Sequence, residues 1–314
     1  MKKIQKLLAI FLFSIFYFLF SASGVGAAVL YLEPSSGEYY QDDTFLVEIR
    51  IDTEGECINT VKADLSFSKE ILEAKDFSQG DSILTLWLEK PKIDQKSGLI
   101  SFTGGIPGGY CGELPGEPGK PNLLGRIIFQ PKEVSGGQPS AKVEFLESSQ
   151  VLLNDGFGTP AKLTRKGAVF TILPEKREVP KEEWQEELAK DTIPPEPFEI
   201  EIQQTPEIFE GKYFITFSTT DKQTGIDYYE VSEVPPIWTL KTAKVEKAES
   251  PYLLKDQSLS SIIKVRAVDK AGNERIAEYI PPKKPLPYWI IIIILVVIVI
   301  IWWILKKRLF KVEP

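Results

Sequence analysis

Hydrophobic and polar residues alternate along most of the first half of the chain, which is the period of half-buried β-strands. Residues 45–52 place Phe45, Val47 and Ile49 on one face with polar residues between them, and residues 61–67 repeat the alternation. Further strand-like runs, separated by turn residues, are 83–88, 99–103, 123–130, 142–146, 150–153 and 167–173. About eight or nine strands without a long helical period predict an all-β sandwich over 29–174, with one short helical turn at 69–74.

A second β-rich stretch covers residues 193–282. Alternating runs occur at 198–202, 213–217 and 263–267, and Trp238 is a candidate core residue. A stretch of about 90 residues has the size of an immunoglobulin or fibronectin-type domain, so we expect a second, smaller β-sandwich.

The connection at 175–192 is dense in Glu and Lys. Pro180 is suited to a first helical position, and Trp184 and Leu188 are spaced to share one helix face. A short helix that packs against a neighbouring domain and a solvated charged linker both fit this pattern. Residues 283–287, rich in proline, predict a stiff stalk.

The two ends of the chain are apolar. Residues 1–28 combine early lysines, a short apolar run and small residues ending at Ala28, which predicts a secretory signal peptide cleaved after that residue. An uncleaved N-terminal anchor is the alternative for this segment. Residues 288–305 carry no charge and have aromatic residues at both ends, which predicts a transmembrane helix rather than a buried core segment.

The tail 306–314 is basic, and the positive-inside rule therefore places it in the cytoplasm. The expected protein is a single-pass plasma-membrane protein whose two N-terminal domains lie outside the cell.

Composition excludes several classes of function. The net charge is −7, so the chain lacks the basic surface that nucleic acids require. It contains no histidine and only two cysteines, which removes the commonest general base and any cysteine-rich zinc site. We expect a protein that is not an enzyme and needs no cofactor.

Cys57 and Cys111 are an even pair in a chain expected to be secreted, which predicts a disulfide. The bond would close a loop of about 54 residues. Two free thiols are the alternative. Residues 104–122, rich in glycine and proline, lack the sequence of a phosphate-binding loop and predict a surface loop.

Two groups of residues could bind a ligand, either calcium or a sugar. For both groups a structural role in turns or packing is the preferred interpretation. Oxygen ligands for calcium are available at Asp42, Asp43, Asp52, Asn154 and Asp155, but none has the spacing of a calcium loop, so turn chemistry is expected and no metal site. The aromatic residues suited to a sugar platform, for which packing is the preferred use, are Tyr39, Tyr40, Trp87 and Tyr110.

Residues 29–174 resemble the cohesin family through a series of short segments in the same order. The segments are Asp42-Asp43-Thr44, the strand 61–67 followed by Ile71-Leu72-Glu73, residues 98–102 before Gly104-Gly105, residues 125–129, and Leu153-Asn154-Asp155-Gly156. Ser68-Lys69-Glu70 departs from the Tyr-Asp-Pro of many cohesins. The resemblance implies a nine-stranded jelly-roll sandwich that binds dockerin modules and is similar to a class of carbohydrate-binding modules.

The second domain resembles bacterial Ig-like or fibronectin-like modules. The resemblance lies in residues 224–231 and in 263–268 followed by Asp269-Lys270-Ala271-Gly272-Asn273. Modules of this kind usually act as spacers.

The resemblance implies a ligand that lies on one sheet face. In 61–67 the residues expected to point outward are Lys62, Asp64 and Ser66, because the apolar residues between them should fill the core. The expected function is a cell-surface binding or adhesion protein whose cohesin-like head recognises a secreted or surface protein, such as a dockerin-like module. The alternative is a carbohydrate-binding surface protein linked to polysaccharide breakdown. An exposed aromatic row would favour sugar, and a flat polar face with a few apolar residues would favour protein.

Overall fold

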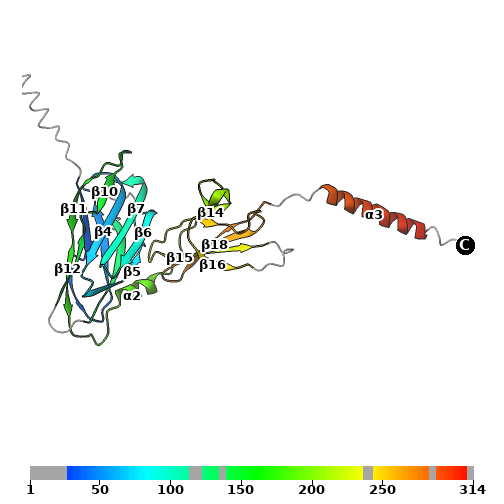
Figure 1. Ribbon diagram of the computed structural model, residues 1–314. Helices are drawn as coiled ribbons and strands as arrows, with labels where there is room; N and C mark the ends of the chain where they lie inside the picture. Colours follow the sequence, from blue (N-terminus) through cyan, green and yellow to red (C-terminus); the bar gives the residue numbers. More distant parts are fainter. Residues whose placement is uncertain (1–26, 113–121, 134–138, 236–242, 283–287, 310–314) are drawn as a thin grey trace, which may run out of the picture.

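The computed structural model describes residues 27–112, 122–133, 139–235, 243–282 and 288–309. Figure 1 shows two β-domains side by side, with a short helix at their junction. We refer to residues 27–173 as the head and to 193–282 as the second domain. Residues 1–26 of the expected signal peptide, Trp238, the expected stalk and the end of the tail lie outside the described residues.

The smaller sheet of the head has the strand order β11-β1-β3-β8-β5. Its pairings are antiparallel except for β1 with β11, which is parallel. The strands are β1 (Ala27–Glu33), β3 (Phe45–Asp52), β5 (Leu72–Ser78), β8 (Leu123–Pro131) and β11 (Lys162–Lys166). Ala28, the last residue of the expected signal peptide, is buried inside β1, so cleavage there would leave Val29 as the first residue of the strand.

The larger sheet of the head has the order β2-β12-β9-β4-β7-β6, and β10 also pairs with β4. Its strands are β2 (Ser36–Tyr40), β4 (Ile58–Phe67), β6 (Leu86–Asp94), β7 (Leu99–Tyr110), β9 (Ser140–Phe145), β10 (Gln150–Leu153) and β12 (Ala168–Leu173). The head is therefore an all-β sandwich, as the alternating pattern predicted.

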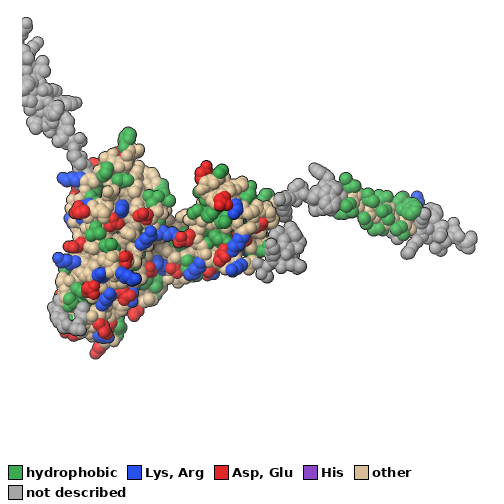
Figure 2. Space-filling view, in the orientation of Figure 1, with side chains coloured by type: hydrophobic (Ala, Val, Ile, Leu, Met, Phe, Trp, Pro, Cys, Tyr) green, Lys and Arg blue, Asp and Glu red, His purple; other side chains and the backbone are tan. Residues whose placement is uncertain are grey.

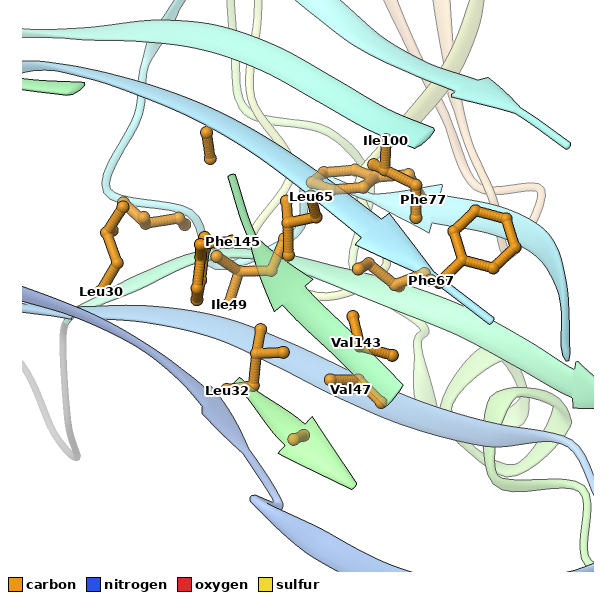
Figure 3. Packing of buried hydrophobic residues seen from close by; sticks show 14 of the residues in the cluster. Leu30, Leu32, Val47, Ile49, Leu65, Phe67, Phe77, Ile100, Val143 and Phe145 are labelled. Carbon is orange, nitrogen blue, oxygen red and sulfur yellow. The ribbon is translucent and has the colours of Figure 1, made fainter. Parts of the chain in front are cut away.

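The core of the head lies between the two sheets and contains the apolar residues of the alternating strands. Figure 3 shows Leu65 of β4 close to Ile49 of β3 and Phe145 of β9. Phe45 stacks on Tyr39, with ring centroids 3.8 Å apart. Burial of this apolar surface is the main contribution to the stability of the domain.

A disulfide joins Cys57 to Cys111, with the Cα atoms 4.0 Å apart. Each cysteine is adjacent to a residue of the β4–β7 pair, since Ile58 lies opposite Tyr110 in the register. The bond therefore fixes one end of a pairing at the centre of the larger sheet.

The charged connection contains the helix α2 (Glu183–Lys190), so the helical interpretation of 175–192 is correct. Trp184 is buried, and the Glu183 carboxylate accepts the backbone N–H of Leu46 at 2.8 Å. The fully buried Asp43 accepts the backbone N–H groups of Tyr40 and Lys181. These contacts attach the connection to the start of β3.

The second domain is built from two small sheets, ordered β13-β14-β17 and β16-β15-β18-β19. The strands are β13 (Glu201–Gln203), β14 (Phe214–Thr216), β15 (Ile226–Val234), β16 (Val245–Ala248), β17 (Tyr252–Leu253), β18 (Ile262–Asp269) and β19 (Glu274–Tyr279), with a 3-10 helix η1 (Phe209–Gly211). Ile215, Val231 and Val265 are central to its core. This domain is therefore also all-β.

The two domains meet along closely packed backbone. Ser78 donates its hydroxyl to the carbonyl oxygen of Thr224 at 2.8 Å, and Lys270 pairs with Asp76 at 2.5 Å. A Cβ atom added to Gly80 would lie 2.0 Å from the carbonyl oxygen of Gln223. Residue 80 must therefore be glycine for this contact to form.

We expect Gly80→Ala to weaken the junction by about 1–3 kcal/mol, because two backbones must separate to admit the methyl group. The melting temperature of the second domain should fall by about 10 °C in calorimetry, because a domain of this size shifts several degrees per kcal/mol. Gly105→Ala is the matched control, since its Cβ would meet nothing closer than 3.7 Å. Equal melting of the two variants would contradict the role of Gly80.

The expected transmembrane helix at 288–305 was wrong. A helix, α3 (Tyr288–Leu309), does form in this range. Among the residues that the structure describes, no helix is long and apolar enough to cross a membrane.

Candidate functional site

The outward surface of the larger sheet, which we call the outer face, is the candidate site. Register partners in a sheet point to the same side, and Lys62, Thr103 and Glu89 form one such row across β4, β7 and β6. Asp64, Ser101 and Lys92 form the next row. The outer face contains Lys62, Asp64, Ser66, Leu86, Glu89, Lys92, Asp94, Leu99, Ser101, Thr103, Lys142, Glu144 and Val169.

Lys62, Asp64 and Ser66 lie on this face, and the apolar residues between them are buried. The Lys62 ammonium lies 3.4 Å from the Asp64 carboxylate, and the two side chains are 42% and 15% exposed. Ser149, a residue that the alternating pattern did not single out, accepts the backbone N–H of Asp64 and donates to its carbonyl oxygen. Lys62 is thus the more accessible of this charged pair.

Polar groups dominate the outer face, and a few apolar side chains interrupt them. Leu86, Leu99 and Val169 are 52%, 38% and 44% exposed. The Thr103 hydroxyl donates to the Glu89 carboxylate at 2.9 Å. On the side of the molecule seen in Figure 2, charged side chains of both signs are interspersed and hydrophobic ones are scattered. This composition matches the pattern expected for a protein-binding face.

The aromatic residues considered for a sugar platform are used in packing. Trp87 contacts Phe102, with ring centroids 5.7 Å apart, and Tyr110 is buried. Burial, with smaller contributions from nearby carboxylates, raises the pKa of Tyr39 to about 12. The Arg177 guanidinium lies 4.5 Å from the centroid of the Tyr40 ring.

The acidic residues considered as calcium ligands in the head act in turns and in the linker contact. Asp52 accepts the backbone N–H of Glu54, and Asp155 accepts that of Phe157. Asn154 donates to the carbonyl oxygen of Gly108. Asp43 accepts the backbone N–H of Lys181 in the charged connection, as described above. The structure does not bring these residues together in one cluster.

A cleft of about 1480 Å³ separates the head from the second domain. Trp87 and Ile93 line the head side, and Tyr228 lines the other. Lys90 pairs with Glu249 across the two domains at 2.8 Å, and the Lys247 ammonium lies 3.7 Å from the centroid of the Tyr228 ring. The cleft is larger than most small-molecule pockets.

Solved structures similar to this chain include cohesins, the family that residues 29–174 resemble. CaCohA2 from Clostridium acetobutylicum is 13% identical and has a TM-score of 0.35; the match covers 48% of this chain and 94% of the cohesin. The OlpC cohesin of Clostridium thermocellum, solved in complex with the dockerin Doc435, is 13% identical, with a TM-score of 0.35 and coverage of 49% and 97%.

A cohesin module from a family 33 glycoside hydrolase of Clostridium perfringens is 13% identical, with a TM-score of 0.32 and coverage of 50% and 98%. Each match spans nearly all of the cohesin and about half of this chain. At this identity and these TM-scores, the likeness carries no conclusion about function. No family model and no curated protein matches the chain.

Proposed function

We propose that this protein is a binding protein whose head recognises a protein ligand through the outer face. The observation that carries the proposal is the composition of that face, which is mostly polar and has isolated apolar residues at Leu86, Leu99 and Val169. Protein interfaces that form and dissociate have this mixture, and a few apolar contacts supply most of their affinity.

The carbohydrate alternative is less well supported by the outer face. Sugar binding on a flat sheet relies on exposed aromatic rings, because the faces of sugar rings stack on them. Trp87, Tyr39 and Tyr110 pack in or against the core instead.

We also propose that the head works outside the reducing cytoplasm. The disulfide between Cys57 and Cys111 supports this location, because structural disulfides persist in oxidising compartments. The partner would then be a secreted or surface protein. Dockerin-bearing proteins are the first class to test, given the resemblance of the head to cohesins.

The test replaces one lysine on each sheet. Lys62→Glu reverses a charge on the outer face, and Lys75→Glu does the same on β5 of the smaller sheet. The two lysine side chains are 42% and 41% exposed, and each pairs with an acidic neighbour. Purified dockerin modules from the same organism are the probes, and affinity is measured by biolayer interferometry with the full chain.

We expect Lys62→Glu to weaken binding about tenfold, equivalent to about 1.4 kcal/mol, and Lys75→Glu to change it less than about twofold. Equal losses in the two variants would exclude the outer face as the contact. Retention of the chain on insoluble polysaccharide, with no binding to any dockerin, would favour the carbohydrate alternative.

A further inference from the structure

Three buried aspartates meet beside the junction of the two domains. Asp191 is the C-cap of α2, Asp221 lies between β14 and β15, and Asp269 ends β18. They are 5%, 4% and 1% exposed. One carboxylate oxygen from each lies within 4.8 Å of the corresponding oxygens of the other two. Three acidic side chains therefore share one small, buried volume.

Neutral groups hold these carboxylates in place. Asp191 accepts the backbone N–H of Thr224 at 3.1 Å and its hydroxyl at 2.5 Å. Asn273 donates its backbone N–H and its side-chain amide to Asp269. No ion pair between described residues includes any of the three aspartates, and the nearby Lys270 extends to Asp76 instead. The hydrogen bonds orient the oxygens but leave their charge uncompensated.

An orphan oxygen points to a missing ligand. Asp221 uses Oδ2 to accept the N–H groups of Gln223 and Gly225, at 3.0 and 2.8 Å. Its other oxygen, Oδ1, is buried and has no hydrogen-bond partner, and the same holds for Oε1 of Gln223. Buried polar atoms without a partner are rare in native structures and call for a bound water or ion.

The electrostatics of Asp221 agree with this reading. Its side chain is 4% exposed, and carboxylate oxygens of Asp191 and Asp269 lie within 4.8 Å of one of its own, so like charges gather without an opposite charge among the described residues. A bound cation would remove this repulsion, since it would be the largest local charge in the cluster.

We propose that Asp191, Asp221 and Asp269 bind a calcium ion. Calcium prefers oxygen ligands at about 2.3–2.6 Å, so three oxygens within 4.8 Å of one another can all reach one ion. Magnesium demands a near-octahedral shell and usually keeps several bound waters, whereas calcium accepts a flexible shell of protein oxygens, so a buried cluster of carboxylates favours calcium. Oε1 of Gln223, which is buried without a hydrogen-bond partner two residues after Asp221, is a candidate for a further, neutral ligand.

The site has a mechanical consequence. The ion would join the end of α2 to the β14–β15 loop and to the end of β18. The same β14–β15 loop contacts the head through Thr224 and Gln223. Calcium would therefore stiffen the connection between the head and the second domain, independently of what the head binds.

The experiment compares melting of the full chain in CaCl₂, MgCl₂ and EGTA. At about ten times the dissociation constant, calcium should raise the melting temperature of the second domain by about 5–10 °C. Asp221→Asn should lose this response and, in EGTA, melt no lower than the parent, because it removes one repelling charge. Asp227→Asn, an exposed residue six positions away, is the matched control and should respond as the parent does.

Three outcomes would overturn the proposal. The first is identical melting of the parent chain in calcium and EGTA. The second is a full calcium response in Asp221→Asn. The third is an equal response to magnesium, which would remove the assignment to calcium.

Discussion

Replacing Leu65 with aspartate is expected to unfold the head. Leu65 is fully buried between the two sheets, where Figure 3 shows it close to Ile49 and Phe145. A carboxylate there would have no partner, and burying an unpaired charge costs more than about 4 kcal/mol. A domain of this size has a total stability of about 5–15 kcal/mol, so most or all of it would be lost. Circular dichroism and urea titration of the full chain measure the effect.

Two variants control for the chemistry of this change. Lys142→Asp introduces the same residue at an exposed position on β9 and should cost less than about 0.5 kcal/mol. Leu65→Ala removes side-chain volume without adding a charge and should cost about 2–5 kcal/mol. A head that stays folded with aspartate at position 65 would show that β4 does not face the core as described.

Uninterrupted alternation located two strands of the head closely. β3 and β4 were predicted within a few residues because each places apolar side chains on one face only. β5 was missed, and the segment 69–74 was expected to form a helical turn instead. Its residues Leu72, Glu73 and Ala74 favour helices, and a register shift between Ala74 and Asp76 breaks the period of two.

Pairing between distant strands is the second feature that the sequence did not reveal. β1 pairs with β11, and β2 with β12, in parallel, although more than 120 residues separate each pair. Alternation shows which side of a strand is buried, but it carries no information about its neighbour. The sheet order therefore came only from the structure.

The candidate sites also differ in how far the sequence predicts them. The outward direction of Lys62, Asp64 and Ser66 followed from alternation within one strand. The hydrogen bonds between Ser149 and the backbone of Asp64 did not follow from it, because Ser149 lies in the turn before another strand, β10. The aspartate cluster draws its members from three separate segments, so no short spacing motif marks it. None of the residues that the sequence offered as calcium ligands, which are Asp42, Asp43, Asp52, Asn154 and Asp155, belongs to this cluster.

Loss of the disulfide is the second change for which we expect a large effect on stability. Cys57→Ser and Cys111→Ser are each expected to lower the free energy of unfolding of the head by roughly 4 kcal/mol, because either change frees a loop of 54 residues in the unfolded chain. The urea midpoint should fall by about 2 M. The two single variants and the double variant should agree when measured in reductant, since all three lack the same bond.

Reduction of the parent chain provides the internal control. Dithiothreitol should shift its urea midpoint to that of the double variant and leave the double variant unchanged. The native parent should react with no thiol reagent before reduction and expose two thiols after it. Two reactive thiols in the folded, unreduced protein would contradict the bond. The bond closes the end of β4 against β7, and β4 carries Leu65 into the core and Lys62 onto the outer face. Loss of the disulfide should therefore weaken ligand binding only as far as it unfolds the head, so affinity per folded molecule should stay within about twofold of the parent.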